Sequence, residues 1–404
     1  MKTEIIAGLT LTLLISSCNV SDRKVPELDK DIKRIQIDAS AIKDTVDVSD
    51  LISKISIVRL EEDGNYMTEA WKVLLSGNHY IVFDRYSCKC IKVFDKGGQL
   101  VKNIFATGDG PKEVLNINDC WINEDGLLEL YDFRLRKILQ LDSDYNPIKA
   151  IKCENHLFFN SIYKFDGLYI GYDGYSDLNP QFNNNSYKVA RLDENFILKE
   201  TTFHFDKEFR GTLISSPINP FLKINNEEVR FFQDFDPYVY NVSKSGDFEK
   251  KYHLDYFPNP LPENFEEKVI KEHLPVFKSS SSDYDARKSV FKGYNGFRGP
   301  WFETMDFVIF TSFDTEYEQF STLYDKEAGE IIGNGRFLKE SKKYNLILPF
   351  FHTVDAAENR YVSVLEGYIL KLFVEGDSPF DQYLSKEEDL ESYYLIEVVL
   401  DSPN

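Results

Sequence analysis

The chain has 404 residues, and its 67 acidic and 47 basic side chains give a formal net charge of −20. This acidic balance argues against nucleic acid as a partner and against adsorption to anionic lipid surfaces. A chain of this length exceeds the size at which one compact core usually stops growing, so two domains or an array of repeats are expected.

The N-terminus has the features of a secretion signal. An uncharged apolar run extends from Ile5 to Ile15, and it is too short to span a bilayer, which needs about 20 apolar residues. The run ends in Ile15-Ser16-Ser17-Cys18. This ending resembles the bacterial lipobox, in which small residues precede a cysteine that carries the lipid.

These features predict a signal peptide over residues 1–17, a lipidated Cys18 and a polar tether over 18–31. The alternative is an ordinary secreted protein in which Cys18 is incidental. Lipidation would make the membrane a partner through the lipid anchor. We therefore expect an exported protein held on the cell envelope, at the outer membrane, with its periplasmic or outer-surface placement left open.

A repeat begins after the tether. Short runs rich in β-branched and aromatic residues recur, separated by Gly, Asn and Asp turn signals. The clearest unit contains four such runs: Ala70 to Leu75, Tyr80 to Phe83, Ile91 to Phe94 and Leu100 to Phe105. Units of this kind follow one another at roughly 40 to 50 residues, the spacing of propeller blades.

Six such units predict an all-β fold, a six-bladed β-propeller of four-stranded antiparallel blades over residues 32–404. An N-terminal strand from Ile55 to Leu60 is expected to complete the last blade, because a closed ring leaves no exposed sheet edge. The tether before this strand should then emerge beside blades one and six. The segment 255–299 interrupts the rhythm between blades four and five. Glu263 to His273 has helix-forming composition, which predicts a small helical insertion that is either a lid over the channel mouth or a peripheral decoration.

The segment from Tyr80 contains Tyr-Ile-Val-Phe-Asp, then Ile-Lys-Val-Phe-Asp-Lys-Gly-Gly-Gln-Leu, then Thr-Gly-Asp-Gly-Pro-Lys-Glu. It resembles the six-bladed β-propeller lipoproteins of gut-type anaerobic bacteria, which are related in shape to NHL-repeat propellers. That family shows a Gly-x-Gly-Pro-Gly-Glu-Tyr element, matched here by Gly108, Gly110, Pro111 and Glu113 but without its last glycine and tyrosine. The resemblance is strong from about Leu51 to Ile151, and it implies a fold and a location but no catalytic residues.

One face of the predicted propeller collects the long loops. In a four-stranded blade, the loops between strands two and three share a face with the connections between blades, so 174–186, 255–299 and 366–392 fall together. Exposed rings and arginines there are expected to bind a carbohydrate, a peptide or an envelope protein. The candidate residues are Arg85, Arg134, Arg136, Tyr172, Tyr175, Phe182, Tyr294, Phe297, Arg298 and Trp301.

The sequence shows no familiar catalytic or metal-binding motif. The six histidines lack metal spacing, and no nucleophile elbow, P-loop or dinucleotide fingerprint is present. We therefore expect a binding or scaffold protein without a cofactor. The alternative is a hydrolase or lyase that uses Glu113, Glu303 and an axial cation such as calcium. Aspartates at strand ends could hold such a cation, although they more often cap turns: Asp84, Asp132, Asp173, Asp234 and Asp314.

Four further cysteines follow Cys18. Cys88 and Cys90 are expected not to pair with each other, because alternate side chains of an extended strand stand about 7 Å apart. Longer-range pairs are open in an oxidising compartment. Buried strand cysteines, and not a zinc site, are the favoured interpretation for this set, which also contains Cys120 and Cys153.

Overall fold

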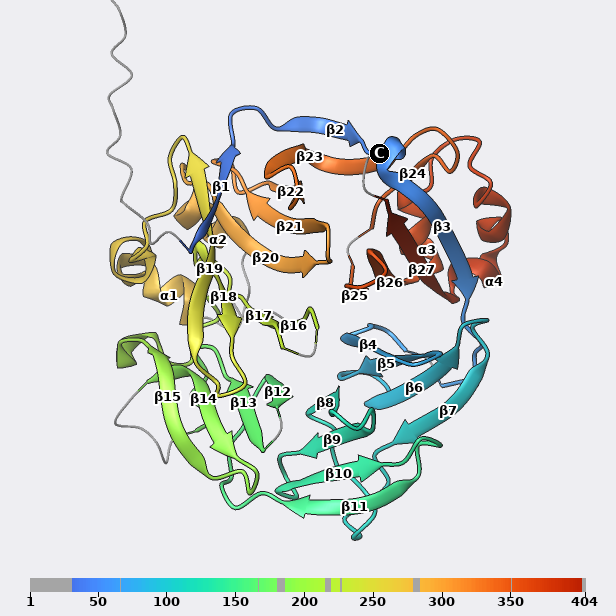
Figure 1. Cartoon of the computed structure of the whole chain (residues 1–404), viewed down its shortest axis with the longest axis vertical. Helices are drawn as coiled ribbons and strands as arrows, with labels where there is room; N and C mark the ends of the chain where they lie inside the picture. The colour runs from blue at the N-terminus through green and yellow to red at the C-terminus, as the bar shows by residue number, and fades with distance from the viewer. Residues whose placement is uncertain are drawn as a thin grey trace, which may run out of the picture.

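The computed structural model describes residues 31–401 except 66, 166, 180–185, 215–218, 226, 279–283 and 350. Within this part of the chain the strands form six sheets around a central axis (Figure 1). Each sheet contains a blade of four antiparallel strands, and two of the sheets carry additional strands at their outer edges, so the fold is the predicted six-bladed β-propeller. The predicted signal peptide and Cys18 lie outside the described residues, as does the predicted tether up to residue 30.

The first three blades follow the chain without interruption. Blade one contains β4 (Lys72–Ser76), β5 (His79–Asp84), β6 (Cys90–Asp95) and β7 (Leu100–Phe105). Blade two contains β8 (Asp119–Ile122), β9 (Leu128–Asp132), β10 (Lys137–Leu141) and β11 (Pro147–Lys152). Blade three contains β12 (Ser161–Phe165), β13 (Leu168–Tyr172), β14 (Tyr187–Asp193) and β15 (Leu198–His204).

The last three blades carry additions. Blade four contains β16 (Phe221–Lys223), β17 (Val229–Phe231), β18 (Tyr238–Val242) and β19 (Phe248–Phe257). Blade five contains β20 (Gly296–Glu303), β21 (Phe307–Phe313), β22 (Gln319–Asp325) and β23 (Glu330–Glu340), with the short β24 (Leu346–Ile347) paired to β23. Blade six contains β25 (Thr353–Asp355), β26 (Arg360–Glu366), β27 (Tyr393–Leu400) and, from the N-terminus, β3 (Ile52–Arg59).

Strand composition follows from packing on both faces of each blade. In β5, Ile81 and Phe83 pack in a cluster with blade two, whereas Tyr80 and Val82 pack in a cluster with blade six. Successive side chains of a strand point to opposite faces, so a strand between two neighbouring blades has an apolar residue at nearly every position. This burial explains the continuous apolar runs that made the repeat visible in the sequence.

The N-terminal segment closes the ring and extends further than predicted. β3 pairs antiparallel with β27, which confirms the predicted closing strand. Before it, β1 (Lys33–Asp38) pairs parallel with β19, and β2 (Lys43–Asp47) pairs parallel with β23. Residues 33–59, which we call the N-terminal strap, therefore run along the outer edges of blades four, five and six (Figure 1).

The strap corrects one sequence-based expectation. The tether was expected to emerge beside blades one and six, directly before the closing strand. That expectation is wrong, because β1 and β2 precede the closing strand and place the start of the described chain on blade four. Their sequences gave little signal, since four of the six residues of β1 and four of the five of β2 are polar or charged.

Replacing Ile37 by alanine should lower the free energy of unfolding by about 2–5 kcal/mol, the usual cost of a cavity left by a truncated core isoleucine. Ile35 and Ile37 are 1% and 0% exposed and belong to the core that joins the strap to blades four, five and six. Urea denaturation measures the loss, and Gln36→Ala on the exposed side of the same strand is the matched control. Equal stability of the two variants would show that the strap lies outside the core.

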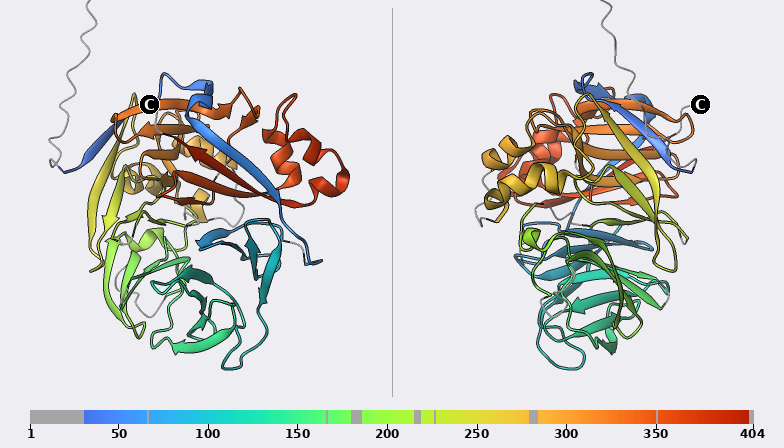
Figure 2. Two further views of the ribbon diagram at one scale, coloured as in Figure 1. Left: turned by 45° about the vertical axis from the view of Figure 1, so that its right-hand side comes forward. Right: turned by 90° about the vertical axis from the view of Figure 1, so that its left-hand side faces the viewer.

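Two helical segments project from the same side of the ring. The insertion between β19 and β20 contains single turns over Glu266–Ile270 and Lys271–His273, then α1 (Leu274–Lys278) and α2 (Tyr284–Phe291). The loop between β26 and β27 contains α3 (Gly367–Phe373), a short turn over Asp381–Leu384 and α4 (Glu387–Leu390). We call this side the loop-rich face (Figure 2, right). Among the described residues, none of the helices has the length and apolar character needed to cross a membrane.

Cys88 and Cys90 form a disulfide, contrary to the sequence-based expectation. The expectation assumed an extended strand, but Lys89 has a φ of 50°, which is the left-handed region. The chain therefore turns between the two cysteines, whose Cα atoms are 5.1 Å apart. Cys120 and Cys153 are buried, as predicted, and they are free.

Candidate functional site

Two cavities lie along the axis of the ring, where the first strands of the blades face one another. The loop-face cavity has a volume of about 410 Å³ and opens among the connections between blades. The opposite-face cavity has a volume of about 480 Å³ and lies among the hairpins between first and second strands. They share Asn219, Phe221 and Leu222 at the inner strand of blade four.

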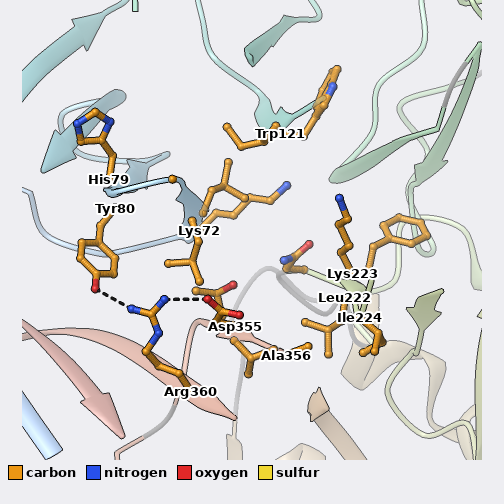
Figure 3. Close-up of a pocket in the computed structure, with 18 of the residues that line it drawn as sticks. Lys72, His79, Tyr80, Trp121, Leu222, Lys223, Ile224, Asp355, Ala356 and Arg360 are labelled. Carbon is orange, nitrogen blue, oxygen red and sulfur yellow. Dashed lines mark hydrogen bonds and ion pairs between the residues drawn. The ribbon is translucent and has the colours of Figure 1, made fainter. Parts of the chain in front are cut away.

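Most of the charged side chains that line the opposite-face cavity form ion pairs within the protein (Figure 3). Lys72 forms a buried ion pair with Asp119, with 2.9 Å between Nζ and Oδ1. Arg360 pairs with Asp355 at 2.8 Å and with Glu397 at 2.6 Å. These pairs join neighbouring strands and blades, which is a structural role, and the exposed Lys223 completes the rim.

The loop-face cavity contains a carboxyl group without a partner. Asp234 follows β17 and lines the cavity, and its Oδ1 is buried with no hydrogen-bond partner among the described residues. Burial raises the pKa of this carboxyl to about 8, although the nearby Arg298 works in the opposite direction. Buried polar groups in folded proteins are nearly always hydrogen-bonded, so an orphaned carboxyl that faces a cavity indicates a functional site.

Three of the other strand-end aspartates accept hydrogen bonds from nearby backbone N–H groups. Asp84 accepts hydrogen bonds from the backbone N–H groups of Thr68, Tyr86 and Ser87. Asp132 and Asp314 accept backbone N–H bonds in the same way.

Asp173 differs from these caps, because it accepts a hydrogen bond from the Asn179 side chain. Burial raises the pKa of Asp173 to about 7. The five aspartates do not converge on the axis. In the part of the chain that the structure describes, no three His, Cys, Asp or Glu side chains come together as metal ligands.

Arg298 lies in β20 on the wall of the same cavity. Its guanidinium carbon stands 4.9 Å from the centre of the Tyr317 ring, and no ion pair joins it to Asp234 among the described contacts. Gly299 has a φ of 69°, and a Cβ there would lie 2.8 Å from Oδ1 of Asp234. Only a residue without a side chain therefore fits beside this carboxyl.

His352 contributes a neutral imidazole. Its Nδ1 accepts a hydrogen bond from the backbone N–H of Val364 at 3.2 Å, which leaves the proton on Nε2. Burial lowers the pKa of His352 to about 4, with a hydrogen bond to the backbone of Ala70 acting against this shift. The ionisable groups of the cavity are thus an acid, a cation and a neutral histidine, set among aromatic walls that include Phe232, Phe302 and Phe351.

The predicted ligand-binding residues are only partly brought together. Arg298 and Trp301 line the loop-face cavity, although Trp301 is fully buried and its Nε1 donates to Glu303. Arg85 lies at the edge, with its guanidinium carbon 5.3 Å from the ring centre of Trp71, another cavity residue. Arg134 and Arg136 are exposed on a loop of blade two and do not reach either cavity.

The expectation that the face rings are exposed is wrong for most of them. Tyr172, Tyr175 and Phe297 are buried, and Tyr175 packs with the insertion helices and donates to Glu266. Tyr294 is half-buried against the same cluster. Phe182 lies outside the described residues. The insertion therefore covers the rings of blades three to five, and its helices flank the cavity without lining it among the described residues.

Neither carboxylate of the hydrolase or lyase alternative faces a cavity. Glu303 is fully buried against Arg230 and Lys326. Burial would raise its pKa, but these two cations outweigh that effect and hold the pKa below its ordinary value. Glu113 accepts a hydrogen bond from the backbone N–H of Gly110 at 3.0 Å.

The glycines of the connection motif make room for Glu113. A Cβ at Gly108 or Gly110 would lie 2.5 or 2.8 Å from its Oε2. Together with Pro111, these residues form a structural turn between blades one and two.

Sequence reasoning did not distinguish Asp234 from its counterparts. The distinguishing signal is Asp234-Phe235-Asp236-Pro237, in which a second aspartate follows the first. Asp236 accepts from the backbone N–H of Tyr238 and from the side chain of Gln233. Asp236 therefore performs the turn-capping role and leaves Asp234 free to face the cavity.

Comparison with known proteins agrees with the architecture. The family model described as Domain of unknown function (DUF4934) matches residues 32–393. None of the curated proteins matches the chain. A crystal structure from Bacteroides fragilis, of a protein whose name describes it as exported, superposes with a TM-score of 0.68 at 16% identity, covering 92% of this chain and all of that one. A member of the DUF4221 family from Bacteroides vulgatus gives a TM-score of 0.50 at 10% identity, covering 88% and 98%.

Proposed function

The chain belongs to the DUF4934 family, and we propose that it is an exported, lipid-anchored binding propeller that holds a carbohydrate or a peptide in its loop-face cavity. The observation that carries this proposal is the pair of Asp234 and Arg298, which line one aromatic-walled cavity and do not pair with each other. A volume of about 410 Å³ falls in the range of small-molecule sites, about 300–1,000 Å³.

The path of the N-terminal strap supports the anchored arrangement. β1 runs parallel to β19, and β19 runs toward the loop-rich face as the fourth strand of its blade. β1 therefore begins on the opposite face. A lipid tether that precedes it would leave the loop-face cavity directed away from the membrane. The name of the Bacteroides fragilis protein supports export.

A binding screen tests the proposal. The fragment 31–404 contains every strand of the closed ring, and it should bind a member of a combined glycan and peptide panel. Arg298→Ala should then weaken binding at least about tenfold, the effect of losing one charge-assisted hydrogen bond. Calorimetry measures both affinities.

Lys223→Ala, at the rim of the opposite-face cavity, is the matched control and should bind as the original chain does. An empty screen would contradict the proposal. So would a ligand whose affinity depends on Lys223 and not on Arg298.

A further inference from the structure

We infer that the ligand of the loop-face cavity is a zwitterion, an amino acid or a short peptide whose ammonium group contacts Asp234 and whose carboxylate contacts Arg298. This inference rests on the proposed function and gives its ligand class. It is carried by an acidic and a basic side chain that line one cavity and do not pair with each other.

Asp234 supplies the site for the ammonium group. Its buried Oδ1 has no donor within the described protein, and a buried carboxyl without a donor is costly. Asp234 as a residue is half-buried and lines the cavity, and the lack of a side chain at Gly299 leaves space beside that oxygen. An incoming N–H group would supply the missing hydrogen bond, and a charged ammonium would do so most strongly.

Arg298 supplies the site for the carboxylate. The face of its guanidinium is held by the Tyr317 ring, and no hydrogen bond or ion pair occupies its N–H groups among the described contacts of this residue. A planar guanidinium fixed in this way presents a fork of donors that matches a carboxylate in two-point geometry. Arg298 lowers the pKa of Asp234, yet no ion pair joins the two side chains among the described contacts. Each of them therefore remains available to a ligand group of the opposite charge.

The wall between the two charges is apolar. Phe232 lines the cavity, and its ring lies 3.6 Å from the position of a Cβ at Gly299, the residue next to Arg298. Phe302 and Phe351 extend this surface. A zwitterion with an apolar or aromatic side chain would match both the charges and the wall, whereas a neutral sugar would leave the charge of Arg298 without a counter-ion.

Ligands with a blocked amino or carboxyl group test the contacts to Asp234 and to Arg298 separately. We would titrate the chain with phenylalanine and with glycylphenylalanine, each in its free, N-acetylated and C-amidated forms, and with glucose and cellobiose. The free forms should bind at least about tenfold more tightly than either capped form. In Asp234→Asn, acetylation should cause no further loss, and in Arg298→Gln, amidation should cause no further loss.

The pH dependence gives an independent readout. Because the pKa of Asp234 is about 8 in the free protein, the affinity for the free ligands should rise between pH 6 and pH 8 and stay flat in Asp234→Asn. Equal affinity for free and capped forms would overturn the inference. Binding of the sugars alone would overturn the zwitterion and leave the proposed function standing, whereas binding of no compound in this panel or in the wider screen would end both.

Discussion

Replacing Glu303 by glutamine should lower the free energy of unfolding by about 3–5 kcal/mol, the range observed when one partner of a buried ion pair is removed. Oε2 and Oε1 of Glu303 lie 2.9 and 3.1 Å from Nε and Nη2 of Arg230, and Nζ of Lys326 lies 2.9 Å from Oε1. Arg230 is only 2% exposed. Without the carboxylate, its guanidinium would remain charged in a buried position.

Urea denaturation measures the loss, and Glu330→Gln is the matched control. Glu330 lies at the exposed start of β23 in the same blade, so its replacement should change stability by less than about 0.5 kcal/mol. Similar stability of the two variants would contradict the structural role of Glu303 and revive its interpretation as a reacting carboxylate.

Replacing Asp234 by asparagine should change the pH dependence of stability. The pKa of Asp234 is raised in the folded chain from 3.8 to about 8, so between these values the folded state binds a proton that the unfolded state has lost. The original chain should therefore lose stability as the pH rises from about 4 to 8, by on the order of a few kcal/mol. The asparagine variant has no proton to lose at this position.

The variant should consequently become the more stable of the two as the pH rises toward 8. Thermal unfolding at several pH values measures the difference. Asp314→Asn is the control, because this aspartate accepts backbone N–H bonds and pairs with Arg336, so its loss should destabilise the chain by about 1 kcal/mol or more. A constant difference between Asp234→Asn and the original chain from pH 4 to pH 8 would show that the carboxyl is not held in a desolvated site.

The number of blades could be predicted because propeller strands are buried on both faces. Strands such as β5 and β27 contain runs of at least three consecutive apolar residues, and apolar runs of this kind recur along the chain. β1 and β2 could not be found in the same way. They lie at the outer edge of the blades, and only Ile35, Ile37 and Val46 among them are buried.

The sequence indicated which face of the propeller carries the candidate cavity, but it did not indicate which aromatic side chains line that cavity. Arg298 and Trp301 do line the cavity. Tyr175 does not, because the composition of a loop cannot reveal that a distant segment, here the insertion helices, packs over it. Asp234 was missed for a related reason, since its freedom depends on which neighbouring aspartate takes the backbone hydrogen bonds of the turn.

The most direct test of the central claim is a crystal structure of fragment 31–404 with the tightest-binding compound of the screen. We expect electron density for the ligand in the loop-face cavity, with ligand atoms within hydrogen-bond distance of Asp234 and Arg298. Density in the opposite-face cavity beside Lys223, or on the outer surface of the blades, would contradict it.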